Sequence, residues 1–412
     1  MRRLDKAEAL MGRARSILRT VFWIATACVC GALENPATAQ STQPLNQQSL
    51  RAVRIGVFSL FRPKELVLRP VAGSSLAVEL GGSHLTLPRD ASSLVVHEID
   101  GEVQFQLAPE SQPARGGSLR AHTPDSRAEN SSRFWLEVPG KLRRQFTGTL
   151  EILAHGQTLE AVVTMPLETA VASVVQAESP PGAGMEALRA QAVAARSFLV
   201  ARRSAHSGFD FCDTTHCQFL RSPPGPASPA AEAARATEEL ILTWRDEESA
   251  QDRPLAAMYA RSCGGQTRTL RAISAPGNPD NLGNPNKGYP YYAVHCVYCS
   301  RHPEVWRREA RSAARPDAGS DSTAEPRTEP RTERDRLNFN RIHGWGAIPS
   351  IASRSSDLTD NAAEGWMTGR GVGHGIGLCQ LGAADMARHG ASFAEILAHY
   401  YPNTRLASIP SP

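Results

Sequence analysis

The chain has 412 residues and a mass of 44.5 kDa, with 41% hydrophobic and 21% charged side chains. These values exclude a single small module and a chain disordered throughout, and they favour two or three folded units. Of the formal net charge of +4, residues 1–39 carry +3 through six basic and three acidic side chains. Because no concentrated basic patch remains in the rest of the chain, we expect no nucleic-acid partner.

The N-terminal segment 1–39 has the pattern of an export signal. Basic residues precede an apolar stretch over 20–33, and an Ala-Thr-Ala sequence that ends at Ala39 provides small residues for cleavage there. The apolar stretch is shorter than the roughly 20 residues that span a bilayer core, so it predicts a cleaved leader. The alternative is a lipid-modified Cys28 or Cys30. Either way we expect an exported protein of the periplasm or cell envelope.

Residues 40–50 are interpreted as a linker and residues 51–165 as a β-rich N-terminal region. A polar stretch rich in Pro, Gly and Ser, 108–132, predicts a long mobile loop between strands. Seven runs of β-type residues predict strands at Val53–Phe61, Glu65–Val71, Ser75–Leu80, Ser93–Ile99, Val103–Leu107, Phe134–Val138 and Thr149–Leu153.

Residues 166–408 are expected to form a mixed core in which helices begin at about residue 184. Apolar residues recur at helical spacing from Met185 to about Arg203. Further expected elements are a helix at 229–239 capped by Ser228, strands at 240–244 and 254–260, and a helix from the capping box Ser392–Glu395 to Tyr400. The stretch 312–336 has almost no apolar residue and predicts a disordered insertion. The fold class is therefore α+β, a β-rich region plus a mixed α/β core with an inserted disordered loop.

Glu178 directly precedes a Pro-Pro-Gly turn that leads into the Ala-rich helix. A stiff connection of this kind suits a general acid, which also needs apolar surroundings that raise its pKa toward neutrality. The alternative is a carboxylate that only caps the N-terminus of the following helix.

Four metal-type ligands lie within twelve residues: His206, Cys212, His216 and Cys217. Two imidazoles and two thiols match the ligand count and softness that tetrahedral Zn²⁺ prefers. A disulfide between Cys212 and Cys217 is the alternative, since an oxidising compartment permits it. The pair Cys296 and Cys299, with Cys263 nearby, offers the same two alternatives, and in an exported protein we interpret it as disulfide chemistry. The sequence does not decide the pairing of Cys263, Cys296, Cys299 and Cys379.

Six glycines fall between residues 369 and 382, and His374 lies between two of them. Its neighbours provide no bulk that could bury it, so we expect His374 to face a cleft. The segment lacks the spacing of a dinucleotide-binding loop and contains no Walker-type lysine, which argues against a nucleotide cofactor.

Several blocks in the right order resemble the stage II sporulation protein D (SpoIID) family, whose domain is shared with the amidase enhancer LytB. The resemblance covers about residues 165–408. It rests on Glu-Ser-Pro at 178–180, Glu-Ala-Leu-Arg-Ala-Gln-Ala-Val-Ala-Ala-Arg-Ser at 186–197, Cys-Asp-Thr-Thr-His-Cys-Gln at 212–218, Ser-Cys-Gly-Gly at 262–265, Gly-His-Gly-Ile-Gly-Leu-Cys-Gln-Leu-Gly-Ala at 373–383 and Ile-Leu-Ala-His-Tyr-Tyr-Pro-Asn-Thr at 396–404. The chain departs from the family pattern at Arg261, where a His is common, and at Leu378-Cys379, where Met-Ser is common.

The resemblance implies a lytic transglycosylase that cuts peptidoglycan glycan strands lacking stem peptides, with Glu178 as catalytic acid. It also implies a structural zinc at His206, Cys212, His216 and Cys217, as in some members. One carboxyl group suffices for such an enzyme, because the 6-hydroxyl of the sugar is the nucleophile. Residues expected to contact the substrate are Gln191, Tyr259, His374 and Gln380, whereas Arg196 is either a substrate contact or a helix-surface charge.

Two other classes of function remain open. The protein could bind glycan without cutting it and enhance a cell-wall amidase, which would then be a partner protein. It could instead be a zinc hydrolase, which would need three protein ligands and one free metal position.

Overall fold

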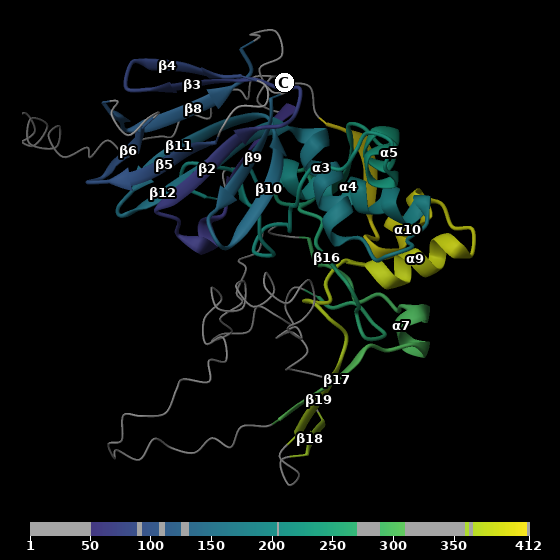
Figure 1. Cartoon of the computed structure of the whole chain (residues 1–412). Helices are drawn as coiled ribbons and strands as arrows, with labels where there is room; N and C mark the ends of the chain where they lie inside the picture. The colour runs from purple at the N-terminus through teal and green to yellow at the C-terminus, as the bar shows by residue number, and fades with distance from the viewer. Residues whose placement is uncertain are drawn as a thin grey trace, which may run out of the picture. The chain divides into compact units, whose positions relative to one another are not determined.

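The computed structural model describes residues 51–88, 93–106, 112–124, 132–203, 206–269, 289–309, 359–361 and 366–409 (Figure 1). The predicted leader, the linker up to residue 50 and the predicted insertion 312–336 lie outside these ranges. None of the helices within them is both long and apolar enough to span a membrane.

Two sheets, antiparallel except for one edge strand, form the β-rich region and pack against each other. The alternating burial along β9, Arg133–Val138, is typical of strands with one face in the core. One sheet has the order β13 (Phe211–Cys212), β1 (Ala52–Val57), β12 (Thr158–Pro166), β11 (Thr149–His155), β8 (Ser118–His122), β3 (Leu76–Leu80) and β4 (Ser83–Leu87). The other has the order β10 (Leu142–Thr147), β9, β2 (Glu65–Pro70), β5 (Leu94–Ile99), β6 (Glu102–Phe105) and β7 (Ala114–Gly116).

All seven predicted strands are confirmed, the first of them ending in a short 3-10 helix, Ser59–Phe61. The predicted loop over 108–132 is wrong within the described residues 112–124, because β7 and β8 lie there. These strands contain few large apolar residues, so the sequence pattern did not indicate them. Leu119 and Ala121 alternate with polar side chains and are completely buried. Strand β13 pairs in parallel with β1, so this sheet also holds the segment that carries the Cys and His cluster.

The second half is built around α4, Met185–Ala201, whose main neighbours are four helices and one strand. Its Ala190, Ala192, Ala194 and Ala195 are fully buried, and small side chains let neighbouring helices approach closely on several faces. These neighbours are α3 (Leu167–Glu178), α5 (Pro229–Ala236), α9 (Gln380–Arg388), α10 (Phe393–Tyr400) and β14 (Leu240–Asp246). Figure 1 shows α3, α4 and α5 side by side.

Short strands complete this half of the chain. They are β15 (Gln251–Pro254) and β21 (Thr404–Ser408) on either side of β14, β16 (Tyr259–Ala260) paired in parallel with β20 (Leu378–Cys379), and β19 (Trp366–Arg370) between β17 (Val305–Glu309) and β18 (Thr359–Asn361). Helix α7 (Val297–Arg301) lies between β16 and β17 in the chain. The single strand expected at 254–260 is wrong, because residues 255–258 separate β15 from β16.

The predicted helices α4, α5 and α10 are confirmed, including the Ser228 cap and the Ser392–Glu395 capping box. Helix α3 was not predicted, so the expectation that helices begin at about residue 184 is wrong. Its β-branched Val171, Val174 and Val175 favour strand in a sequence-based assignment, and burial of most of its residues removes the amphipathic pattern.

Arg196 on α4 joins four elements although no part of its side chain is exposed. Its guanidinium donates to both carboxylate oxygens of Glu168 on α3, at 2.7 and 2.5 Å. It also donates to the carbonyl oxygens of Ala234 and Leu240. The interpretation of Arg196 as a helix-surface charge is therefore wrong, and its buried guanidinium offers no surface for the other interpretation, a substrate contact.

We expect Arg196→Met to lower the free energy of unfolding by about 3–5 kcal/mol, because it leaves the Glu168 carboxylate and two carbonyl groups without their donor. The matched control is Arg189→Met, which removes a half-buried ion pair with Glu186 on the same helix and should cost about 0.5 kcal/mol. Urea denaturation of the two variants tests this. Equal losses would contradict a structural role for Arg196.

Candidate functional site

Glu178 is the last residue of α3 and is 7% exposed. The Phe219 backbone amide donates to its Oε1 at 2.5 Å. The alternative role as N-cap of α4 is wrong, because Gly184 occupies that position and no side chain caps the helix there. The carboxylate is therefore held between the end of one helix and the chain that follows the Cys and His cluster.

Three predicted residues gather near this carboxylate from three separate elements: Gln191 on α4, Tyr259 on β16 and Gln380 at the start of α9. The Gln380 side-chain amide donates to Gln191 Oε1 at 3.2 Å. Glu178 and Gln191 are both close enough to the Tyr259 hydroxyl to influence its pKa. Burial, followed by the negative charge of Glu178, raises that pKa well above its ordinary value, so the phenol stays protonated and can donate a hydrogen bond.

Polar atoms in this group are buried without a hydrogen-bond partner among the residues that the structure describes. They are Gln191 Nε2, Gln380 Oε1, and the flanking Ser179 Oγ and Gln218 Oε1. Leaving a buried donor or acceptor unpaired costs about 1–3 kcal/mol, so such a concentration is rare in a purely structural core. The arrangement is typical of a site that water or a polar ligand completes. We call Glu178, Gln191, Tyr259 and Gln380 the polar cluster.

Sequence reasoning missed two contributors to this site. The Phe219 amide carries no side-chain signal, and only the fold brings it to Glu178. Gln218 ends the Cys-Asp-Thr-Thr-His-Cys-Gln block, so its position in that block could have marked it.

His374 is half-buried and adjoins the polar cluster at the backbone of Tyr259. The Ile376 amide donates to its Nδ1 at 3.0 Å, which places the proton of the neutral ring on Nε2. The ring also hydrogen-bonds the backbone of Tyr259. The glycines around it are needed for this turn: at Gly377, where φ is +66°, a Cβ would lie 2.0 Å from the Met258 carbonyl oxygen. His374 therefore fixes the loop beside Tyr259.

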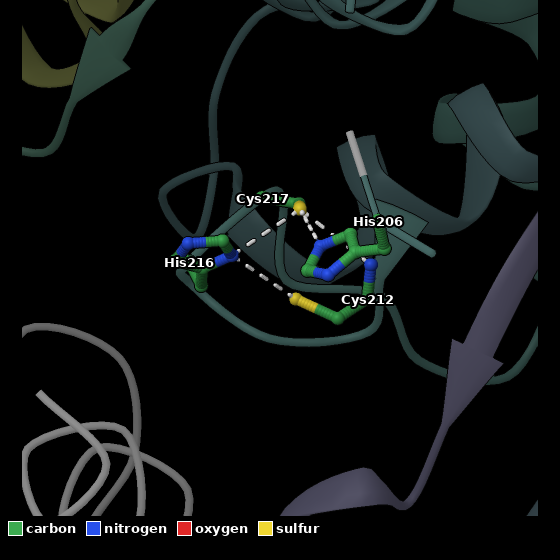
Figure 2. A group of neighbouring side chains, drawn as sticks. All are labelled: His206, Cys212, His216 and Cys217. Atoms are coloured by element: carbon green, nitrogen blue, oxygen red, sulfur yellow. Dashed lines mark hydrogen bonds between the residues drawn. The ribbon is translucent and has the colours of Figure 1, made fainter. Parts of the chain in front are cut away.

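The predicted ligands His206, Cys212, His216 and Cys217 converge in space (Figure 2). Their ligand atoms all lie within 4.8 Å of one another. His216 Nδ1 is 3.7 Å from Cys212 Sγ and 3.6 Å from Cys217 Sγ, and both cysteines are free thiols, not a disulfide. In a tetrahedral zinc site the bond lengths imply a separation of roughly 3.6 Å between a nitrogen and a sulfur ligand, so the donor set fits Zn²⁺.

The loop that carries these ligands is anchored to the β-rich region. Asp213 follows the ligand Cys212, and its carboxylate accepts a hydrogen bond from Arg144 on β10 at 2.8 Å. The Cys212 thiol has a strongly lowered pKa, first through its hydrogen bond with Cys217 and then through those with His206 and His216. A thiolate beside two imidazoles is the chemistry that a divalent metal ion requires.

The pH dependence of stability tests the neutral state of the half-buried His374. Burial lowers its pKa to about 4, although the hydrogen bond to the Tyr259 backbone opposes this shift. Between its ordinary pKa of 6.5 and pH 4 the unfolded chain binds a proton that the folded chain does not, so the free energy of unfolding falls as pH falls through this window.

We expect this contribution to reach roughly 1–3 kcal/mol by pH 4. In His374→Asn, whose side-chain oxygen can accept from the Ile376 amide, the loss between pH 6.5 and 4 should be smaller by that amount. Denaturant titrations of both proteins across the window measure it. Superimposable pH profiles would contradict a neutral His374.

The comparisons with known proteins agree with one another. Residues 155–244 match the family model SpoIID, described as Stage II sporulation protein. Stage II sporulation protein D of Bacillus amyloliquefaciens is 27% identical over 273 residues, which are 61% of this chain and 77% of that protein. The protein of the same name from Bacillus subtilis (strain 168) is 25% identical over 270 residues, 60% of this chain and 76% of its own length.

A further relative shares one short block. The protein named Amidase enhancer of Bacillus subtilis (strain 168) is 50% identical over 42 residues, 10% of this chain and 6% of that protein. The matched family model includes Glu178, Gln191 and the whole Cys and His cluster. Residues 155–244 of this chain are therefore similar to the stage II sporulation protein D family.

Proposed function

We propose that this protein acts on the bacterial cell wall as an exported lytic transglycosylase. Its substrate would be peptidoglycan glycan strands that lack stem peptides, and it would cleave the bond between N-acetylmuramic acid and N-acetylglucosamine. The observation that carries the proposal is the polar cluster, a buried carboxylate beside buried polar atoms with unfilled hydrogen-bonding capacity.

Glu178 would perform both proton transfers. As an acid it protonates the glycosidic oxygen, so that the bond to the leaving sugar breaks. As a carboxylate it then accepts the proton of the 6-hydroxyl of N-acetylmuramic acid while that oxygen closes a 1,6-anhydro ring. No water molecule and no second carboxylate enters this sequence. The Phe219 amide donates a hydrogen bond to one carboxylate oxygen of Glu178. This bond would orient the carboxyl group, so that its other oxygen exchanges the proton.

The neighbouring polar groups would bind and orient the sugar. Tyr259 remains a phenol, so its hydroxyl can donate to a sugar oxygen, while Gln191 Nε2 and Gln380 Oε1 supply one donor and one acceptor. An acceptor such as Gln380 Oε1 would also stabilise the positive charge that develops on the ring in an oxocarbenium-like transition state.

Glu178→Gln tests the proposed chemistry, since it keeps the shape of the side chain and removes its acid–base function. With purified full-length protein and stem-peptide-free glycan strands, we expect the rate of anhydro-end formation to fall about 100-fold or more. Mass spectrometry of the products measures it. The matched control is Glu102→Gln, an exposed carboxylate on β6, which should retain full activity.

Three outcomes would contradict the proposal: no cleavage by the unaltered protein, cleavage that Glu178→Gln preserves, or products with reducing ends, which indicate hydrolysis. A second candidate function rests on the 42-residue similarity to the Amidase enhancer. A protein that only enhances a cell-wall amidase would stimulate that amidase equally well with Glu178 or Gln at position 178.

His206, Cys212, His216 and Cys217 would hold a structural Zn²⁺, whose four protein ligands leave no position for an activated water. Bound there, the ion would stiffen the loop that leads to the Phe219 amide. We expect His206→Gln to lose this ion and to melt at a lower temperature, whereas the exposed His155→Gln should change neither. Native mass spectrometry and thermal denaturation measure both. A chain purified with a Cys212–Cys217 disulfide and no metal would contradict this site.

A further inference from the structure

Four cysteines that the sequence suggested as disulfide partners meet in a second cluster. Cys263 follows β16, Cys296 and Cys299 flank the first turn of α7, and Cys379 ends β20. All four are free thiols, and each is at most 5% exposed. The prediction of disulfides among these four cysteines is therefore wrong. We call these residues the four-cysteine cluster.

The geometry of the four-cysteine cluster matches one tetrahedral metal ion. The four sulfur atoms all lie within 4.8 Å of one another, and Cys299 Sγ is 3.4 Å from Cys379 Sγ. Zn–S bonds of about 2.3 Å in a tetrahedron imply sulfur atoms roughly 3.8 Å apart. A pair of disulfides would instead sort the four sulfurs into two bonded pairs, with about 2 Å inside each.

Two neighbouring hydroxyl groups contact the sulfur atoms, as residues around the ligands of a metal ion commonly do. The Ser262 hydroxyl is 3.5 Å from Cys299 Sγ, and the Tyr400 hydroxyl is 3.4 Å from Cys296 Sγ. Hydrogen bonds of this kind orient thiolate ligands and offset part of their charge. Gly382 makes room for them, because a Cβ there would lie 2.5 Å from Cys296 Sγ and 2.1 Å from the Tyr400 oxygen.

The chemistry of the donor set selects the metal. Four thiolates and tetrahedral geometry favour Zn²⁺ or a single iron over magnesium, calcium or manganese, which prefer oxygen ligands. The sulfurs are too close together to enclose a multi-iron cluster, in which several iron atoms separate the thiolates. Zn²⁺ undergoes no redox change, which suits a buried structural site.

We propose that Cys263, Cys296, Cys299 and Cys379 bind one structural Zn²⁺ ion, separate from the ion proposed at His206, Cys212, His216 and Cys217. Four protein ligands close the coordination sphere, so this ion would not take part in a reaction. The inference stands on the thiol geometry and does not depend on the proposed transglycosylase activity.

The proposed ion would lie next to two residues of the polar cluster, Tyr259 and Gln380. Tyr259 on β16 pairs with Leu378, the residue before the ligand Cys379, and Gln380 follows that ligand directly. Cys263 lies four residues beyond Tyr259. One ion would thus fasten both strand ends that present Tyr259 and Gln380, while α7 supplies the other two ligands.

The test is the metal content of the purified full-length chain. We expect native mass spectrometry to find two zinc ions per chain in the unaltered protein. The double variant Cys296→Ser and Cys299→Ser should retain one, as should the double variant Cys212→Ser and Cys217→Ser. Gly382→Ala, which crowds Cys296 without removing a ligand, should lose zinc from the second site first when chelator is titrated in.

A measurement on the unaltered protein guards against variants that fail to fold. Alkylation followed by peptide mapping should find the four cysteines protected until a chelator removes zinc, and then modified together. Disulfides among the four, iron in place of zinc, or alkylation at equal rates with and without chelator would each overturn the proposal. So would a zinc content that the Cys296 and Cys299 substitutions leave unchanged.

Discussion

The hydrogen bond from the Phe219 amide to the Glu178 carboxylate is the contact on which the site depends. Glu178 ends α3, and Phe219 follows the loop that carries the Cys and His cluster, so this bond joins two segments that are 41 residues apart. The position of the amide depends in turn on that loop. Pairing of β13 with β1 and the ion pair between Asp213 and Arg144 fasten the loop to the β-rich region, which therefore contributes to the geometry of the carboxylate.

Helix α4 brings the opposite side of the site into place. A helix surrounded on most faces cannot carry large side chains everywhere, and its alanines allow α3, α5, α9 and α10 to approach. Two long polar side chains on this helix, Arg196 and Gln191, make different contacts. Arg196 joins α3, α5 and β14 through buried hydrogen bonds, whereas Gln191 reaches Gln380 in the polar cluster. Packing and site geometry are thus specified by the same helix.

Two groups of thiols lie next to the segments that form the site. The Cys and His cluster precedes the Phe219 amide, and the four-cysteine cluster adjoins Tyr259 and Gln380. Short strands such as β16 and β20, of two residues each, form few backbone hydrogen bonds of their own. Cross-linking by metal ions is one way to hold such segments at fixed positions, because metal binding adds its free energy to that of folding.

The amino-acid sequence by itself determined the fold class, seven strands, the helices α4, α5 and α10, and the two cysteines and two histidines that converge at residues 206–217. These features are local: periodicity, capping boxes and closely spaced ligands depend on neighbours within a few turns of the chain. Only the tertiary structure decided that Arg196 is buried, that α3 is a helix despite its valines, and that Cys379 joins cysteines about 80 and more residues away. Such outcomes depend on which surfaces meet, and no local pattern records contacts between distant segments.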